Sequence, residues 1–213
     1  MYLTQMRLDL GKRATLIALS APGKLHGAVE AAFSGPRQRP LWRIDSRGGQ
    51  RYLLILSRDE PELSALLTQF APAGETGQTK DYAPLLSRVC AGSRWQFRLR
   101  ANPTYSAPAG PGQRGRVCAH STTQAQLSWL EKQSGRYGFF LVPDRYTVTE
   151  NKWYHFRKNG TGGYVSFLSV TYDGILEVRD AELFRTALCD GIGPEKAYGN
   201  GLMTLMRAGG GHG

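Results

Sequence analysis

The chain has 213 residues and a formal net charge of +10, with 41% apolar and 10% aromatic residues. A chain of this length and composition can bury the core of one large or two small domains, which excludes disorder over its whole length. No apolar run reaches the roughly 20 residues that a bilayer span requires, and the N-terminal segment alternates and becomes charged at once. We therefore expect no membrane partner and no secretory signal.

Positive charge is concentrated in two stretches. Residues 88–116 hold six arginines and no acid, and residues 37–58 hold six arginines against one acid, Asp45. Such a field attracts polyanions, and nucleic acid is the commonest partner of a soluble protein with this charge. The alternative is a solvated basic surface without a ligand. A membrane surface is a weaker option, because no long helix with a basic face is found.

The three cysteines, Cys90, Cys118 and Cys189, are widely spaced. They match neither a disulfide framework nor a zinc site, and they indicate a reducing cytoplasm. Neither HExxH nor CxxC spacing occurs, and the acids do not cluster as ligands would. We therefore expect no metal and no cofactor.

The first half of the chain predicts strand, helix, two strands, helix and strand. Pro22 and Gly23 break the chain after the first strand, and helical spacing of apolar residues follows. Asp59 with Glu62 is a capping-box pattern that predicts the start of the second helix. In chain order the expected elements are a strand at 5–10, a helix at 25–33, strands at 41–44 and 52–56, a helix reaching 70 and a strand at 78–82.

The second half repeats this order. Ser121 with Gln124 predicts a helix that ends near Gly135, and Asp180 predicts another that Gly191 stops. The expected elements are a strand at 95–99, a loop at 102–116, the first helix, strands at 138–142, 152–157 and 164–170, the second helix and a strand at 202–206.

Two βαββαβ units in tandem are the ferredoxin-like, or RRM-like, arrangement of the α+β class. We place the first domain at 1–84 and the second at 93–213. The first would carry the candidate catalytic histidine, and the second a basic hairpin and a glycine-rich loop.

Four histidines could carry chemistry. His212 lies in a glycine-rich tail, His120 just before a helix cap and His155 on a predicted strand, whereas His26 lies in the first turn of a helix. The free N–H groups and the dipole of a helix N-terminus favour phosphate, and Lys24 adds a cation beside it.

RNA brings its own nucleophile, the 2′-hydroxyl, so its cleavage needs proton transfer and charge stabilisation without a metal. An imidazole with a pKa near 6.5 suits the proton transfer. Helical spacing alone favours a capping or packing role for His26.

Two further segments could approach RNA. The segment 191–201 contains Lys196, and its glycines would allow either close approach to a phosphate or tight packing of helix on strand. The hairpin 152–170 carries Arg157 and Lys158 beside a glycine-rich tip, and a thin basic ribbon could enter the narrow major groove of A-form RNA. The alternative is an edge hairpin kept soluble by charge. Aromatic platforms of the RRM type are not evident in the expected strands.

Taken together, these segments resemble the CasE family, the repeat-processing subunit of type I-E Cascade, over nearly the whole chain. The motifs that carry the resemblance are residues 1–4 (MYLT), 25–33 (LHGAVEAAF), 41–44 (LWRI), 97–103 (FRLRANP), 172–178 (YDGILEV) and 191–205 (GIGPEKAYGNGLMTL).

The resemblance implies two ferredoxin-like domains and metal-independent cleavage of precursor CRISPR RNA at the 3′ base of repeat stem-loops. It implies that the enzyme keeps its product and joins the other Cascade subunits, chiefly the backbone subunit. The family's catalytic histidine maps to His26, and we assign Lys24 to charge stabilisation beside it. The candidate RNA-binding residues are Arg157, Lys158, Arg98, Arg100, Arg114, Arg116, Arg39 and Lys196.

One position departs from the family. Many relatives carry a tyrosine three residues before the histidine, where this chain has Gly23. Lys24 could supply the missing help, or another residue such as Tyr198 could. The departure keeps a second function open, that of a non-catalytic subunit that binds an RNA hairpin. A small-molecule enzyme is remoter, because no cofactor fingerprint or paired-carboxylate site is present.

Overall fold

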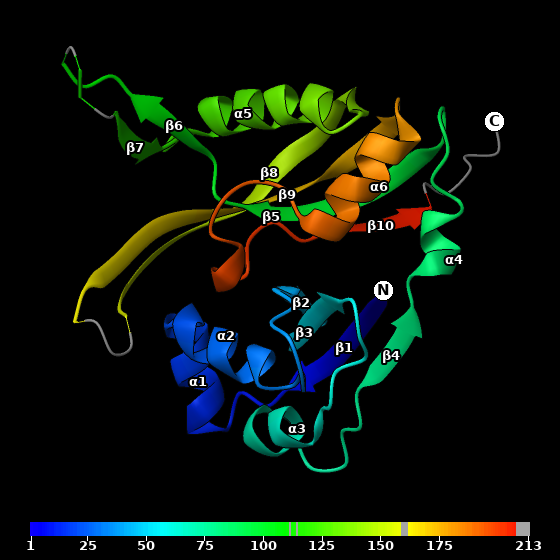
Figure 1. The fold of residues 1–213 in the computed structure, drawn as a ribbon, viewed down its shortest axis with the longest axis vertical. Helices are drawn as coiled ribbons and strands as arrows, with labels where there is room; N and C mark the ends of the chain where they lie inside the picture. The colour runs from blue at the N-terminus through cyan, green and yellow to red at the C-terminus, as the bar shows by residue number, and fades with distance from the viewer. Residues whose placement is uncertain (111, 114, 159–161, 208–213) are drawn as a thin grey trace.

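The computed structural model describes residues 1–110, 112–113, 115–158 and 162–207. These residues form two four-stranded antiparallel sheets, each with helices packed on it (Figure 1). The predicted α+β fold with tandem ferredoxin-like units is confirmed. The division at 1–84 and 93–213 stays a prediction.

The first unit follows the chain order that its sequence predicts, with one added helix. Its elements are β1 (Tyr2–Leu8), α1 (Arg13–Ser20), α2 (Pro22–Glu30), β2 (Leu41–Arg47), β3 (Gln50–Ser57), α3 (Ser64–Phe70) and β4 (Gln78–Asp81). The sheet order is β2-β3-β1-β4, so the first strand lies between the third and the fourth, as in a ferredoxin-like unit.

In the first unit, helix α1 is an element that sequence reasoning missed. Its buried residues are Thr15 and Ala18, whereas its large apolar residues Leu16 and Ile17 are 53% and 41% exposed. The apolar pattern therefore does not mark the buried face, and the periodicity on which a helix prediction depends is lost.

The expected cap at Asp59 is wrong. Helix α3 begins at Ser64, whose backbone N–H donates to Glu62 at 3.0 Å. The Asp59 carboxylate instead accepts a hydrogen bond from the Gln38 amide at 2.5 Å. The Asp59 carboxylate, which the capping-box pattern predicted to cap the helix, is therefore bound to Gln38 instead.

The second unit follows the short helix α4 (Ala83–Leu86). Its elements are β5 (Arg94–Ala101), β6 (Thr104–Ala107), β7 (Arg116–Ala119), α5 (Thr123–Arg136), β8 (Phe139–Arg157), β9 (Tyr164–Val178), α6 (Ala181–Asp190), the 3-10 helix η1 (Lys196–Tyr198) and β10 (Met203–Arg207). The sheet order β10-β5-β9-β8 repeats that of the first unit.

Three expectations in this half need correction. The predicted loop at 102–116 contains β6, which pairs with β7 as a separate two-stranded sheet. Helix α5 is capped by Thr122, not by Ser121, since the Thr122 hydroxyl accepts from the Ala125 N–H at 3.3 Å. The strands expected at 138–142 and 152–157 are one strand, β8, with register shifts between Leu141 and Tyr146 and between Val148 and Glu150.

Strands β8 and β9 extend beyond the body of their sheet as a two-stranded ribbon (Figure 1). One face of this ribbon packs towards the first unit: Lys152 Nζ donates to Leu19 O at 3.2 Å, and Phe156 packs near Ala21. The ribbon thereby reaches the start of α2.

Segment 191–201, which carries η1, lies against α2 and β2. A Cβ atom added at Gly199 would lie 2.7 Å from the Trp42 ring, and one at Gly191 would lie 2.8 Å from Leu41. The glycines therefore do permit tight packing, but against β2 of the first unit rather than between the helix and the strand that the segment joins. Close approach to a phosphate stays a prediction.

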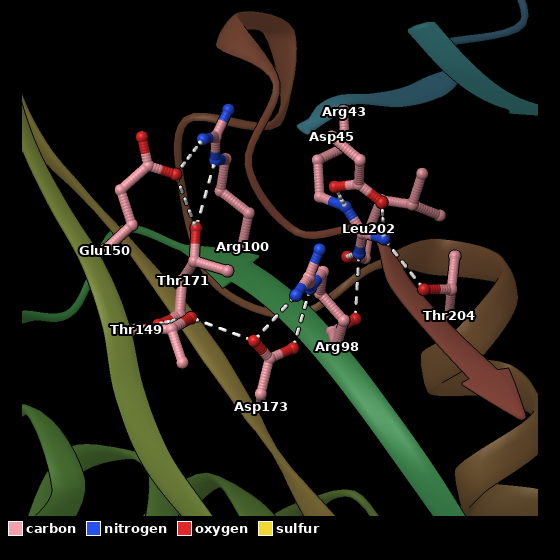
Figure 2. A network of polar contacts seen from close by, with 10 residues as sticks. All are labelled: Arg43, Asp45, Arg98, Arg100, Thr149, Glu150, Thr171, Asp173, Leu202 and Thr204. Carbon is pink, nitrogen blue, oxygen red and sulfur yellow. Dashed lines mark hydrogen bonds and ion pairs between the residues drawn. The ribbon is translucent and has the colours of Figure 1, made fainter. Parts of the chain in front are cut away.

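A buried arginine joins the two sheets. The side chain of Arg43 on β2 is 1% exposed, and its guanidinium donates to the backbone oxygens of Arg98 and Leu202 at 2.8 and 2.9 Å (Figure 2). It also donates to the Asp45 carboxylate at 2.7 and 2.8 Å and to the Thr204 hydroxyl at 2.7 Å. Charge-assisted bonds of this kind are stronger than neutral ones, so Arg43 fixes how the start of β10 meets β2.

Candidate functional site

Helix α2 sets the position of His26. Pro22 occupies its first turn, where a missing N–H is tolerated, and Leu25 and Val29 are buried on the helix face that packs on the first sheet. His26 follows Leu25 and therefore projects from the border of that face. Its side chain is 22% exposed, which leaves one part of the ring open to solvent.

The surroundings of His26 favour its neutral form. Its Nε2 atom lies 3.4 Å from Oε2 of Glu30, one helical turn along α2, and Glu30 also accepts a hydrogen bond from Arg37 at 2.7 Å. Burial lowers the pKa of His26 below its ordinary 6.5, Glu30 opposes this shift, and Arg37 adds to it. At neutral pH the imidazole is therefore unprotonated and able to accept a proton.

His26 lines a small basic hollow between α2 and the β8–β9 ribbon. This hollow measures about 240 Å³ and is lined also by Lys24, Arg157, Lys158 and Tyr198. Lys24, Arg157 and Lys158 are exposed. The structure thus brings the predicted catalytic pair together with the predicted basic hairpin, in a space able to hold an anionic group.

An aromatic wall closes one side of the small hollow. The ring of Tyr198 meets that of His26 edge-on at 6.3 Å and stacks on Phe167 at 5.7 Å. A Cβ atom added at Gly23 would lie 3.2 Å from Phe156 and 3.7 Å from Tyr198. The room beside Gly23 is thus taken by rings from the second unit. Burial raises the pKa of Tyr198, and Glu195 adds to the shift, so its hydroxyl stays protonated at neutral pH.

On its other side His26 borders a larger hollow of about 880 Å³. Arg37, Arg39, Arg58 and Lys196 are among its lining residues, together with Glu30. Lys196 Nζ donates to the backbone oxygen of Asp190 at 2.7 Å, and burial lowers the pKa of this amine. His26 therefore stands between two adjoining cation-lined hollows, which together can take a chain of phosphates.

Other predicted RNA-binding residues lie outside both hollows. Arg98 binds the Asp173 carboxylate with bonds of 2.7 and 2.9 Å, and Arg100 binds Glu150 at 2.8 Å (Figure 2). The two carboxylates therefore neutralise part of the positive charge on which the prediction of RNA binding rested. Their role in binding RNA stays a prediction.

The same holds for the β6–β7 hairpin. Arg116 is exposed on β7 and lines neither of the two hollows. Arg114 lies outside the described residues.

Sequence reasoning missed three residues that surround His26. Glu30 stands four positions after His26 on the same helix, a spacing that could have identified it. Arg37 and Arg58 belong to the basic stretch already noted, but only the fold brings them to the wall of the larger hollow.

The remaining histidines occupy other sites. His120 packs on Tyr105 at 4.8 Å and His155 stacks on Tyr164 at 4.9 Å, whereas His212 lies outside the described residues. Among the described residues, no three His, Cys, Asp or Glu side chains gather as a metal site would need. None of the described helices is long and apolar enough to cross a membrane.

Comparison with known proteins gives one consistent class. A family model described as "CRISPR associated protein" matches residues 1–207. The CRISPR-associated endoribonuclease Cse3 of Thermus thermophilus is 30% identical over 96% of this chain and 99% of its own length. The Cascade subunit CasE of Escherichia coli K12 is 31% identical over 51% of this chain and 56% of its own.

Solved structures agree. Cse3 bound to a 19-nucleotide RNA superposes with a TM-score of 0.82 at 28% identity, covering 97% of this chain and 100% of that one. T. thermophilus Cse3 bound to an RNA that represents a pre-cleavage complex gives 0.80 at 27%, covering 96% and 98%. The family model and the full-length relative thus define a CRISPR-associated protein. More particularly, the chain belongs to the Cse3/CasE family.

Proposed function

We propose that this protein is a metal-independent endoribonuclease that cuts precursor CRISPR RNA at the 3′ base of repeat stem-loops. One observation carries the proposal: a partly exposed His26, whose pKa is lowered by burial, stands between two adjoining hollows lined with cations. Cse3, which matches over almost the full length of both chains, is named an endoribonuclease and has been solved with RNA, which supports the same activity here.

The reaction is an attack of the ribose 2′-hydroxyl on the adjacent phosphorus. His26 accepts the proton of that hydroxyl, the bond from phosphorus to the 5′-oxygen breaks, and the leaving oxygen takes up a proton. The products are a 2′,3′-cyclic phosphate and a 5′-hydroxyl. Tyr198, whose hydroxyl stays protonated near His26, is the donor that we assign to the leaving oxygen.

Cations stabilise the charge that gathers on the phosphorane. Lys24 lines the small hollow next to His26 and is the nearest ammonium in the sequence. A positive group aimed at developing charge stabilises a transition state more than it stabilises the substrate. Arg157 and Lys158, on the ribbon side of the same hollow, hold the stem.

The partners follow from the same assignment. The protein binds the stem-loop of CRISPR repeat RNA, retains the product and joins the other Cascade subunits, chiefly the backbone subunit. Structures of CRISPR RNA-guided surveillance complexes contain chains of the same fold, at 23–24% identity. Cys90, Cys118 and Cys189 are free thiols, which fits a location in the reducing cytoplasm.

A non-catalytic hairpin-binding subunit is the second candidate. It is favoured by Gly23, which leaves no side chain where many relatives carry a tyrosine. Wild type and a His26 variant would then leave repeat RNA equally intact, so one cleavage assay separates the two functions.

The proposed function is tested with purified protein, repeat RNA and excess EDTA. We expect cutting at one phosphodiester, cyclic phosphate on the upstream product, and no cutting of an RNA that lacks the 2′-hydroxyl at that nucleotide. Activity that EDTA abolishes, or cutting of the deoxy-substituted RNA, would contradict the mechanism.

A further inference from the structure

The β8–β9 ribbon has two faces of different character. Tyr154, Phe156 and Phe167 are buried and pack with Ala21 and Tyr198 against the first unit. Because side chains alternate along a strand, the residues between them point the other way. That second face is not used by the cleavage mechanism, apart from Arg157.

Three rings lie on the second face. Trp153 is 59% exposed, Tyr164 is 68% exposed, and His155 is exposed between them. The His155 and Tyr164 rings are stacked, with centroids 4.9 Å apart and planes 8° from parallel. Trp153 precedes His155 by two residues, about 7 Å along the strand. We call these three residues the stacking face.

The charge around the stacking face suits a polyanion. From Asn151 to Lys158 the chain has three cations and no acid. Arg157 alternates with Trp153 and His155 on the stacking face and Lys158 follows it, whereas Lys152 lies on the opposite face. The described part of the returning strand from Gly162 to Tyr172 has no acid either. Large rings left exposed in such a setting mark a binding surface, and the missing acids disfavour a basic protein surface as its occupant.

Arg157 connects the stacking face with the cleavage site. It lines the small hollow with His26, and it is the direct partner of Tyr164 in the register of the ribbon. An RNA strand that leaves the hollow past Arg157 therefore meets the Tyr164–His155 stack next, and then Trp153.

We propose that the stacking face binds unpaired nucleotides that adjoin the base of the repeat stem, whose bases stack on Tyr164 and Trp153. This inference rests on the proposed function for the identity of the RNA. Base stacking on exposed aromatic side chains is the common mode of recognising single-stranded RNA, and it tolerates any base sequence. The stem itself is paired and does not need such a surface.

The test measures dissociation constants at one fixed salt concentration, since salt changes RNA affinity. The RNAs are the bare stem-loop, the stem-loop with an unpaired 5′ flank, and the stem-loop with an unpaired 3′ flank. Each carries a 2′-deoxy nucleotide at the cleavage position, so that binding is read without cutting. The difference between a flanked and the bare RNA is the contribution of the flank.

We expect Trp153→Ala and Tyr164→Ala each to reduce the contribution of at least one flank by about 5- to 150-fold, the value of one stacked base. Trp153→Phe and Tyr164→Phe keep a ring and should retain most of the flank's contribution to affinity, whereas Trp153→Leu should lose that contribution. Phe140→Ala is the matched control, because Phe140 is an aromatic residue 49% exposed on the same strand, outside the stacking face.

Loss of the contribution of the 5′ flank, the 3′ flank or both supports the inference and identifies the bound nucleotides. The inference is overturned if the alanine variants keep both contributions, or if they weaken the bare stem-loop by the same factor. It is also overturned if they bind every RNA as wild type does and lose only assembly with another protein. Whether wild type cuts unmodified RNA in EDTA is read separately, so failure of the proposed function is not confused with failure of this inference.

Discussion

At the scale of single residues, the chemistry depends on which proton His26 holds. Burial and Arg37 lower its pKa while Glu30 raises it, and burial is the largest of the three effects. A histidine whose pKa is lowered is unprotonated from neutral pH down to some value below 6.5. This is the form that a general base requires.

The pH dependence of cleavage follows from that sign. With saturating RNA, the single-turnover rate should rise as the pH increases through the lowered pKa of His26 and should level off towards neutral and higher pH. Arg37→Ala removes a lowering influence and should move the midpoint up, whereas Glu30→Gln should move it down. A rate that falls between pH 6 and 7 would show that the protonated imidazole acts instead.

The chain break before a helix made His26 and Lys24 candidates, but only the resemblance to the CasE family assigned the catalytic role to His26, since helical spacing alone favoured packing. Sequence reasoning did not find Glu30 as the partner of His26, although the two stand four residues apart on one helix. Arg98 and Arg100 were chosen for charge alone, and the sequence did not reveal that Asp173 and Glu150 hold them. Charge is a property of composition, whereas pairing requires the register of the sheet.

At the scale of elements, segment 191–201 brings Tyr198 to His26 from the other unit. The segment can pack this closely because Gly199 has a φ of +81° and leaves room for the Trp42 ring. Sequence reasoning identified the glycine-rich segment and suggested Tyr198 as a possible partner of His26. It could not show that the segment contacts α2, because the two lie far apart along the chain. Likewise, α1 was missed because its exposed leucine and isoleucine conceal its buried face.

The hydroxyl of Tyr198 can be tested without disturbing this packing. Tyr198→Phe keeps the ring against Phe156 and Phe167. It should leave RNA affinity within about twofold of wild type and lower the cleavage rate at saturation by roughly 10²- to 10⁴-fold, the range of a general acid.

Tyr105→Phe is the matched control, since Tyr105 also packs on a histidine but on the β6–β7 hairpin. If Tyr198→Phe cuts as fast as wild type, the proton for the leaving oxygen comes from another group.

At the scale of the whole molecule, the two units meet across a polar junction centred on Arg43 (Figure 2). Its guanidinium makes five hydrogen bonds, two of them to backbone oxygens of β5 and of the residue just before β10. Leu202 directly follows segment 191–201, so the junction helps to hold the Tyr198 wall against α2. The tandem ferredoxin-like order was predictable from repeated hydrophobic patterns. This junction was not, because nothing in the sequence distinguishes Arg43 from the other arginines of residues 37–58.

Removal of the junction should destabilise the fold strongly. Arg43→Ala leaves the Asp45 carboxylate and two backbone oxygens without their donor, at a cost of about 3–5 kcal/mol in the free energy of unfolding. Arg94→Ala is the control, because its ion pair with Glu177 is exposed and should contribute at most about 1 kcal/mol. Both are measured by denaturant unfolding. Equal effects of the two substitutions would refute the role given to Arg43.

The most direct test of the account compares wild type with His26→Ala on the same repeat RNA. We predict that the variant binds an uncleavable RNA with an affinity close to that of wild type, while its single-turnover cleavage rate at saturating RNA falls by about 10²- to 10⁴-fold. Retention of the wild-type cleavage rate by His26→Ala would contradict the account.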